Sequence, residues 1–430
     1  MPDRFARHSW ACLVLWSFAA IAPAQTTPLP TGPAIALEEA LARTMAGNPE
    51  LAAFGHRVDA ALGRLQQAHI APNPELDLAV ADALGTDDYR GLRSAETTVT
   101  IAWVLERGIR RRQVDAAVAD VSLREVETRI MQLDAAAETA RRFLACLAYQ
   151  ARLENAVRAV GLAAETVDAV RRRVAAGGAA RAELSRAEAG LVRAGILEEE
   201  YTHELLSAYH RLSAQWGAKD PDFNRVEGNV RKLPAVQPLT ALLSRVDSNP
   251  DLALFLSRRR LAEAELHIAQ ARSRPNWRVH AGVRRIERTD DLALVGGISV
   301  PLGTRSRHLG RIAETRAEMA RAQGEARARR VHIEAALFVL HQELLHHVNV
   351  AASLRDRVIP LLESALDSTH RAYVLGRGSY LELSAVQAEL LQVDGELLET
   401  GVDAHGLVVE IERLTGVPVL YPAAAQRGQP

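Results

Sequence analysis

"GNPELAAF" at residues 47–54 and "SNPDLALF" at residues 248–255 are nearly the same phrase, and both occur in one chain of 430 residues. Asn, Pro, Leu, Ala and Phe recur in register, at the constant spacing of 201 positions that separates Asn48 from Asn249. Identities held in register over such a distance indicate a duplicated structural unit. The architecture of the chain therefore follows from what one unit contains.

A second pair of segments extends the duplication. "VAAGGAARAELSRAEAGL" at residues 174–191 matches "YVLGRGSYLELSAVQAEL" at residues 373–390, at a spacing of 199 positions. We therefore predict two tandem repeats that are joined by a linker and followed by a short tail. Their predicted bounds are 35–217 for the first repeat, 218–235 for the linker, 236–417 for the second repeat and 418–430 for the tail.

Residues 1–24 have the features of a cleaved secretory signal peptide. Arg4 and Arg7 precede an apolar stretch at 10–21, and a small-residue cleavage site ends at Ala24. A membrane anchor is the alternative, but the apolar stretch is shorter than the roughly 20 residues that a spanning helix needs. We therefore expect export from the cytoplasm.

Composition excludes several classes of partner. The chain carries 52 basic and 53 acidic residues, so it has no strong field that would collect nucleic acid. Cys12 precedes the apolar stretch of the signal, which argues against lipidation, and Cys146 then remains as a lone cysteine that we expect in the core. After the signal, no run of apolar residues is long enough for a transmembrane helix.

The first repeat contains helices and two strands. Apolar residues recur at helical spacing over 35–70, and alternation of apolar and polar residues predicts strands at 74–80 and 97–105, which form a hairpin. A helical pattern then runs from Gly108 to Ala176 and predicts a helix on the order of 100 Å long. A glycine turn and a returning helix over 181–216 complete the repeat.

The second repeat follows the same plan. We predict helices and strands in the same order, with a turn at 288–291 between the strands. The predicted elements are a helix over 237–273, strands at 275–283 and 292–300, a long helix over 310–375 and a helix over 380–414.

All four strands have one apolar face and one small or polar face. Strands of this kind are typical of a barrel in lipid, but four are too few to close one, because the smallest spanning barrels have about eight. Three copies of the chain would supply twelve strands. The residues expected to line the lumen are Thr98, Thr100, Arg278, His280, Arg284 and Ser299. Trp103, Trp277 and Tyr89 are expected either at the rims of the barrel or in ordinary packing.

These features resemble the TolC-type outer membrane efflux proteins, and among them the CzcC-like heavy-metal branch. The resemblance covers nearly the whole mature chain and rests on the duplication, the two "NP" phrases, "VLERGIRRRQVDAA" (104–117), "VPLGTRSRHLGRIAE" (300–314) and the segment at 373–390. It implies a mainly α fold with a small β part, in which a homotrimer forms a 12-stranded barrel in the outer membrane and a long α-helical tunnel in the periplasm. It also implies a periplasmic adaptor, or membrane fusion protein, and an inner-membrane pump of the proton-driven resistance-nodulation-division type.

The resemblance also implies that the two helix–helix turns are the periplasmic tips at which the adaptor docks. Glycine lets a partner backbone approach closely, although the same residues are also needed simply to make the turns. The residues concerned are Gly177, Gly178 and Ala179 in the first repeat and Gly376, Arg377, Gly378 and Ser379 in the second.

Near these tips the family closes its tunnel with polar contacts. Tyr373 and Glu183 stand where such a tyrosine and acid occur, and Glu382 matches an acidic position that faces the pore, although a solvated helix residue is the alternative for Glu382. This chain departs from the best-known pattern, because Gly378 replaces an arginine and Ala385 replaces a second acid. The resemblance thus implies a lock that is weaker or differently built.

Other signals carry less weight. The spacing of His332, His341, His346 and His347 does not suit a metal site, so we expect no bound metal. The arginines at 110–112 could contact lipid headgroups or be ordinary surface residues. No nucleophile–base set or phosphate-binding loop is present, so we predict neither an enzyme nor a cofactor.

We therefore predict a passive outer-membrane exit channel of a tripartite efflux system that exports heavy-metal cations. A duct for drugs or secreted polypeptide is the first alternative. A soluble periplasmic adaptor or coiled-coil scaffold is the second, and the two strand hairpins flanked by long helices argue against it.

Overall fold

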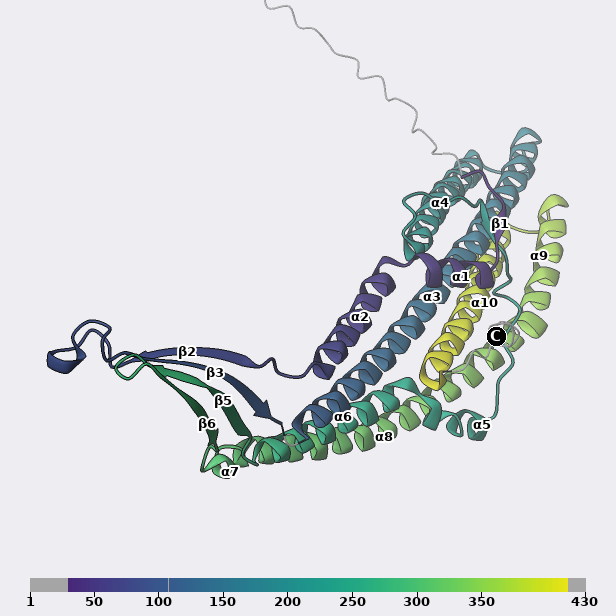
Figure 1. The fold of residues 1–430 in the computed structure, drawn as a ribbon. Coiled ribbons are helices and arrows are strands. Elements are labelled where there is room, and N and C mark those ends of the chain that lie inside the picture. The colour runs from purple at the N-terminus through teal and green to yellow at the C-terminus, as the bar shows by residue number, and fades with distance from the viewer. Residues whose placement is uncertain (1–29, 107, 417–430) are drawn as a thin grey trace, which may run out of the picture.

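The protein is elongated, with a sheet at one end and a body of long helices at the other (Figure 1). The computed structural model describes residues 30–106 and 108–416. The predicted signal peptide and the tail at 418–430 lie outside the described residues. Within the described ranges, no helix combines the length and the apolar composition that crossing a bilayer would require.

The "NP" phrase of the first repeat separates two helices, α1 (Leu37–Gly47) and α2 (Pro49–His69). The Asn48 side chain accepts hydrogen bonds from the amides of Glu50 and Leu51, at 2.9 and 3.0 Å. Proline suits the first position of a helix, where its missing N–H is not needed. Asn48 also donates to the carbonyl of Gln215 at 2.8 Å, so the cap ties the start of α2 to the end of the repeat.

In the second repeat, the helical stretch predicted over 237–273 is divided at its Asn-Pro phrase, as the stretch predicted over 35–70 is in the first repeat. The chain forms α5 (Leu239–Leu243), the 3₁₀ turn η3 (Val246–Ser248) and α6 (Pro250–Arg272). Asn249 caps α6 by accepting from the Asp251 amide, and Pro250 has no N–H with which to continue the preceding helix. The same cap thus breaks the chain in both repeats.

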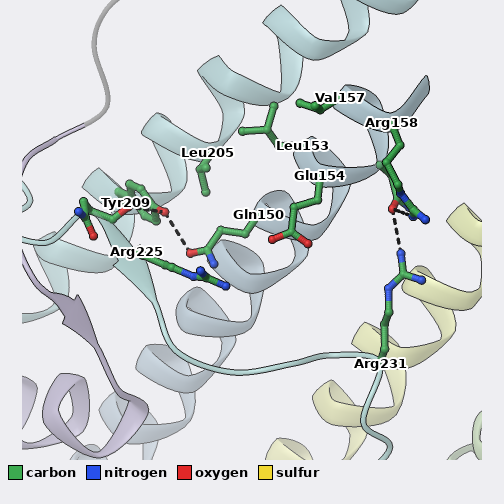
Figure 2. A pocket seen from close by; sticks show the side chains of 11 residues that line it. Gln150, Leu153, Glu154, Val157, Arg158, Leu205, Tyr209, Arg225 and Arg231 are labelled. Carbon is green, nitrogen blue, oxygen red and sulfur yellow. Dashed lines mark hydrogen bonds between the residues drawn. The ribbon is translucent and has the colours of Figure 1, made fainter. Parts of the chain in front are cut away.

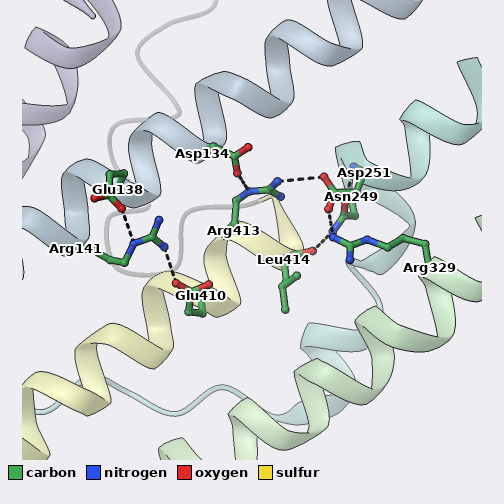
Figure 3. Close-up of polar contacts among 9 residues, drawn as sticks. All are labelled: Asp134, Glu138, Arg141, Asn249, Asp251, Arg329, Glu410, Arg413 and Leu414. Atoms are coloured by element: carbon green, nitrogen blue, oxygen red, sulfur yellow. Dashed lines mark hydrogen bonds and ion pairs between the residues drawn. The ribbon is translucent and has the colours of Figure 1, made fainter. Parts of the chain in front are cut away.

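Only the second cap is buried in a network of charges (Figure 3). Asp251 is 7% exposed and pairs with both Arg413 and Arg329. Arg413 also pairs with Asp134, while Asn249 donates to the carbonyl of Leu414. The corresponding residue of the first repeat, Glu50, is exposed. The second cap therefore joins α6 to three other helices, α3 (Ile109–Ala175), α8 (Leu309–Ser353) and α10 (Tyr380–Thr415).

The predicted strands pair into one antiparallel sheet in the order β2-β3-β5-β6. Their bounds are β2 Glu75–Ala81, β3 Glu96–Leu105, β5 Trp277–Ile286 and β6 Asp291–Ser299. The loop between β2 and β3 contains the short turn η1 (Asp87–Tyr89). Pairing of β3 with β5 joins the two repeats at the centre of the sheet and leaves β2 and β6 as its edges.

The register of the sheet separates its two faces. Thr98 pairs with Arg284, and Arg278 pairs with Ser299, so that all six predicted lumen residues lie on the same face. The opposite face is apolar and open, with Leu76 71% exposed and Leu294 91% exposed. A lone copy of the chain therefore leaves an apolar surface without cover.

In the first repeat, helix α3 (Ile109–Ala175) is 67 residues long and unbroken, as predicted. It returns through a turn into α4 (Arg181–Ser213), which ends in the 3₁₀ turn η2 (Ala214–Trp216).

In the second repeat, the predicted single helix over 310–375 is interrupted. After the short α7 (Thr304–Arg307), α8 (Leu309–Ser353) runs into the π segment η4 (Leu354–Val358) and then α9 (Ile359–Val374). Pro360 has no N–H to donate to the preceding turn, which accounts for the change in winding. A turn then leads into α10 (Tyr380–Thr415).

The linker is an ordered strap and contributes to the main core. Its strand β4 (Arg225–Val226) pairs in parallel with β1 (Ala34–Ile35), a contact that the sequence did not predict. Phe223 of the strap packs edge-to-face on Tyr209, with ring centroids 5.1 Å apart. Cys146 lies in the same core, fully buried, as expected.

Candidate functional site

The two helix–helix turns have the same backbone geometry. The amides of Gly177 and Gly178 donate to the carbonyls of Val174 and Arg173, at 3.0 and 2.8 Å. In the second turn, the Gly376 and Arg377 amides make the equivalent bonds to Tyr373 and Ala372, at 3.0 and 2.9 Å. This pattern is the Schellman helix ending, which needs a residue with positive φ. Gly177 and Gly376 supply it, with φ of +72° and +76°.

Both turns are open to an approaching partner. A Cβ atom added to Gly177 or to Gly376 would meet no other heavy atom within 4 Å. The neighbouring positions Arg377 and Ser379 are exposed, while Ala179 and Gly378 are partly covered. The predicted docking residues therefore form two similar exposed tips, and their docking role stays a prediction.

One arginine, Arg173 at the end of α3, ties the two turns together. Its Nη2 donates to the Gly178 carbonyl at 2.8 Å, in its own turn. Its Nη1 donates to the carbonyls of Tyr373 and Gly378 in the second turn, at 3.1 and 3.3 Å. The guanidinium also lies 4.4 Å from the centroid of the Tyr373 ring, which is within cation–π range. We call this group the Arg173 clamp.

Tyr373 connects the clamp to one of the predicted gate acids. The ring is fully buried among Val167, Val170 and Leu383. Its hydroxyl donates to a carboxylate oxygen of Glu183 at 3.4 Å. Burial, and next to it the Glu183 charge, raise the pKa of the Tyr373 hydroxyl above its ordinary value, so it stays a proton donor. The structure thus brings two of the three gate candidates together.

The third gate candidate, Glu382, makes a different contact. Its carboxylate accepts from the Ser379 amide at 3.0 Å, and the Ser379 hydroxyl accepts from the Glu382 amide at 3.2 Å. This is a capping box at the start of α10. The backbone hydrogen bond, and then the one from the Ser379 side chain, lower the Glu382 pKa. In one copy of the chain, the carboxylate is turned back onto its own helix.

Divergence between the repeats explains the two roles. Glu183 and Glu382 are equivalent by the spacing of 199 positions, but Ala180 stands where the second repeat has Ser379. Alanine has no oxygen with which to cap, and α4 has no side-chain cap. Glu183 is therefore left to accept from Tyr373. Sequence reasoning missed Arg173, and its only local signal is the arginine run that precedes the first glycine turn.

The polar face of the sheet is the second place where predicted site residues meet. Arg278 pairs with Glu75 at 2.7 Å, and Arg284 pairs with Glu96 at 2.8 Å. Arg284 Nε also donates to the Thr98 hydroxyl at 3.1 Å. Of the other predicted lumen residues, Thr100 and Ser299 share this face, and the His280 ring lies where a side chain on Gly297 would be. The face is charged, and the arginines in these pairs are held by acids.

A cavity of about 740 Å³ lies under the linker, but its contacts are structural (Figure 2). Tyr209 donates to Gln150 at 3.0 Å, and the same Gln150 oxygen accepts from the Val226 amide at 2.8 Å. Arg231 donates to Asn155 at 2.8 Å. These polar groups hold the strap onto α3 and α4, and no nucleophile or base is arranged among them.

The four histidines at 332, 341, 346 and 347 do not gather into one cluster in the part of the chain that the structure describes. His341 is buried and its Nε2 lies 3.1 Å from the Gln237 carbonyl oxygen, while the rings of His346 and His347 are 5.8 Å apart. Residues 30–106 and 108–416 contain no group of three or more His, Cys, Asp or Glu side chains that could hold a metal ion.

Comparisons with known proteins agree with this architecture. A family model described as "Outer membrane efflux protein" matches residues 40–218. The chain is 26% identical over 382 residues to the cobalt-zinc-cadmium resistance protein CzcC of Cupriavidus metallidurans, a match that covers 89% of this chain and 90% of that protein. It is 25% identical over 299 residues to the nickel-cobalt-cadmium resistance protein NccC of Alcaligenes xylosoxydans xylosoxydans, with 67% of each chain covered.

Solved structures share the fold. The outer membrane protein VceC of Vibrio cholerae matches with a TM-score of 0.66 at 18% identity, over 89% of this chain and 96% of that one. CusC, whose structures concern folding and transmembrane channel formation, matches with a TM-score of 0.66 at 16% identity, over 92% and 98% of the two chains. At these identities the likeness concerns the fold alone.

Proposed function

We propose, from the premise that this chain belongs to the outer membrane efflux protein family, that it is the passive exit channel of a tripartite efflux system for heavy-metal cations. The protein is an outer-membrane protein with a helical body in the periplasm. Energy for export would come from an inner-membrane pump of the resistance-nodulation-division type. A periplasmic adaptor would connect that pump to the two tips.

The observation that carries the proposal is the two-faced sheet with two free edges. Its apolar face is exposed, its opposite face carries charged pairs, and within residues 30–106 and 108–416 no further strand pairs with the outer side of β2 or β6. Exposed strand edges tend to pair with another chain. Three copies joined edge to edge would give twelve strands, enough for a closed barrel with the charged face in its lumen. The homotrimer is therefore part of the proposal.

The cargo is proposed from the relatives. CzcC is named as a cobalt-zinc-cadmium resistance protein, and NccC as a nickel-cobalt-cadmium resistance protein. The described residues have no cluster that would hold such an ion in place, which suits a conduit that binds its cargo only weakly. The lumen would select little, so the choice of cargo would rest with the pump.

Deletion of the gene from its host tests the cargo. We expect a deletion strain to tolerate less cobalt, zinc and cadmium, with drug tolerance unchanged and metal tolerance restored by the gene in trans. If metal tolerance is unchanged and drug sensitivity is heightened, the cargo is drugs and not heavy metals. A purified protein that is monomeric and absent from the outer-membrane fraction would overturn the channel itself.

Bulky residues at the tips test the adaptor contact. Gly177→Trp and Gly376→Trp would also strain the turns because of their positive φ. Ala179→Trp lacks that complication and is the better variant, and Gly195→Trp, in the middle of α4 with open space around it, is the matched control. We expect Ala179→Trp to lose export and adaptor cross-linking while trimers still form. If all three tip variants still export metal, the adaptor does not dock at the tips.

A further inference from the structure

The strongest unassigned feature of the molecule is a cavity where the sheet meets the long helices. It has a volume of about 810 Å³ and lies between the end of β3, the start of α3 and the chain that joins α2 to β2. Its volume is within the range of small-molecule sites. The residues that matter here are Trp103, Leu105 and Val279 on one side and Arg110 and Arg111 on the other.

The first side of this cavity belongs to the apolar face of the sheet. Trp103 is 44% exposed and Leu105 47% exposed. Trp103 pairs with Val279 of β5, so the wall is formed by the two central strands. The edges that would meet other copies of the chain are β2 and β6. Trimer formation would therefore leave this wall facing the acyl chains of the bilayer.

The other side of the cavity carries positive charge. Arg110 and Arg111 are exposed in the first turn of α3 and form no ion pair with a described residue, whereas the adjacent Arg112 pairs with Asp115 at 3.5 Å. The first turn of α3 contains no acid. Glu106 and His69 also line the cavity, so one carboxylate faces two guanidinium groups, and the balance favours an anion.

We propose that this cavity binds an anionic phospholipid of the periplasmic leaflet, with the phosphate on Arg110 and Arg111 and an acyl chain along Trp103 and Leu105. The proposal rests on the outer-membrane location of the proposed function. Guanidinium groups bind phosphate through paired hydrogen bonds, and tryptophan favours the level of the headgroups. The cavity therefore has arginines for the phosphate on one side and apolar side chains for the acyl chain on the other, as a phospholipid requires.

Fluorescence quenching can test this proposal on the full-length protein. The chain would be reconstituted in phosphatidylcholine vesicles, and phosphatidylglycerol with brominated acyl chains would be titrated in. A Trp277→Phe background removes the tryptophan that pairs with Leu105 on the same face. In it we expect stronger quenching by this lipid than by brominated phosphatidylcholine, and we expect Trp103→Phe to remove most of the difference. Equal quenching of the Trp277→Phe protein by the two lipids would overturn the headgroup preference.

Charge variants locate the headgroup. We expect Arg110→Gln/Arg111→Gln to weaken the preference by roughly fivefold per arginine, which is about 25-fold for both. Arg110→Lys/Arg111→Lys keeps the charge and should keep most of the preference. Arg129→Gln/Arg193→Gln removes two exposed charges elsewhere and should change nothing. A preference that is unchanged in the glutamine variant, or lost equally in the lysine variant, would overturn the site.

The assay also separates this inference from the proposed function, because it needs no transport. A chain that prefers phosphatidylglycerol but exports no metal would contradict the proposed cargo and keep the lipid site. Quenching by neither lipid would contradict membrane embedding, and with it both proposals.

Discussion

Replacing Arg173 by glutamine should weaken the coupling of the two tips. In the structure, this side chain supplies the hydrogen bonds of the Arg173 clamp, two of which cross from the first turn to the carbonyls of Tyr373 and Gly378. Glutamine is shorter, neutral and unable to stack as a cation on the Tyr373 ring. The Tyr373–Glu183 contact at 3.4 Å is long for a hydrogen bond. Without the clamp, the hairpins would be joined by the packing of Tyr373 on Val167 and by the Gln387–Thr166 hydrogen bond at 2.9 Å.

The expected magnitude follows from the contacts that cross. The two crossing bonds share one nitrogen, at 3.1 and 3.3 Å, so they count as about one charged hydrogen bond, worth about 1.5 kcal/mol. The cation–π contact adds about 0.5 kcal/mol, the low end for a half-exposed guanidinium. The sum of about 2 kcal/mol would raise the ratio of separated to joined tips about 30-fold.

Spin labels measure this separation without any assumption about transport. Labels at Ala176 and Leu375, which are exposed next to the two turns, would report the distance between the tips. We expect a single short distance in the native protein and a broad, longer distribution in Arg173→Gln. If the protein is a channel, the same substitution should lengthen its open periods in a planar bilayer.

Arg172→Gln is the matched control. Arg172 precedes Arg173 on the same helix, is exposed, and its side chain forms no hydrogen bond or ion pair with the described residues of the second turn. It removes one charge from the same tip, so a general charge effect would appear in both variants. Equal distances in the native protein and Arg173→Gln, or equal broadening in both variants, would refute the clamp.

Three further predictions concern packing and titration. Asp251→Ala should lower the free energy of unfolding by roughly 3 kcal/mol in chemical denaturation, because it removes the buried carboxylate that pairs with the half-buried Arg413 and with Arg329, whereas the exposed equivalent Glu50→Ala should cost little. Burial raises the pKa of the Cys146 thiol to about 12, so it should resist alkylation at pH 8 until the chain unfolds. The pKa of Glu382 is lower in the folded protein than its ordinary value of 4.5. Its carboxylate cap should therefore stabilise α10 fully above pH 4.5 and lose this effect as the pH falls through the lowered pKa. The protection factors of the amides at the start of α10, which correct for the slower intrinsic exchange in acid, should therefore fall as pH falls through that value. Glu382→Gln, which cannot titrate, should remove that dependence.

Much of the fold could be predicted because its signals are local or periodic. Alternation located all four strands, and the glycine turns ended α3 and α9 where expected. Errors came where a single residue overrides a period. Pro250 divides a helical pattern into α5 and α6, and Pro360 accompanies the π segment between α8 and α9. The pairing of β1 with β4 could not be predicted, because strands of two residues are too short to show an alternating pattern.

The candidate site divides in the same way. The glycines of the turns could be recognised because positive φ is a property of one residue and its neighbours. The Arg173 clamp could not, because Arg173 and Tyr373 lie 200 positions apart and meet only when two hairpins pack. Equivalent acids also acquired different partners: Ser379 holds Glu382, and Ala180 leaves Glu183 for Tyr373.

By itself, the sequence determined the duplication, the order of helices and strands, and the two-faced character of the strands, since each depends on spacing along the chain. Tertiary structure alone decided which strands are central, which arginines are paired, and which guanidinium joins the tips. Arg284 faces Glu96 and Arg110 faces a cavity, yet nothing in their neighbouring residues distinguishes them. Charge pairing and cavities depend on distances across the fold, and those distances exist only after packing.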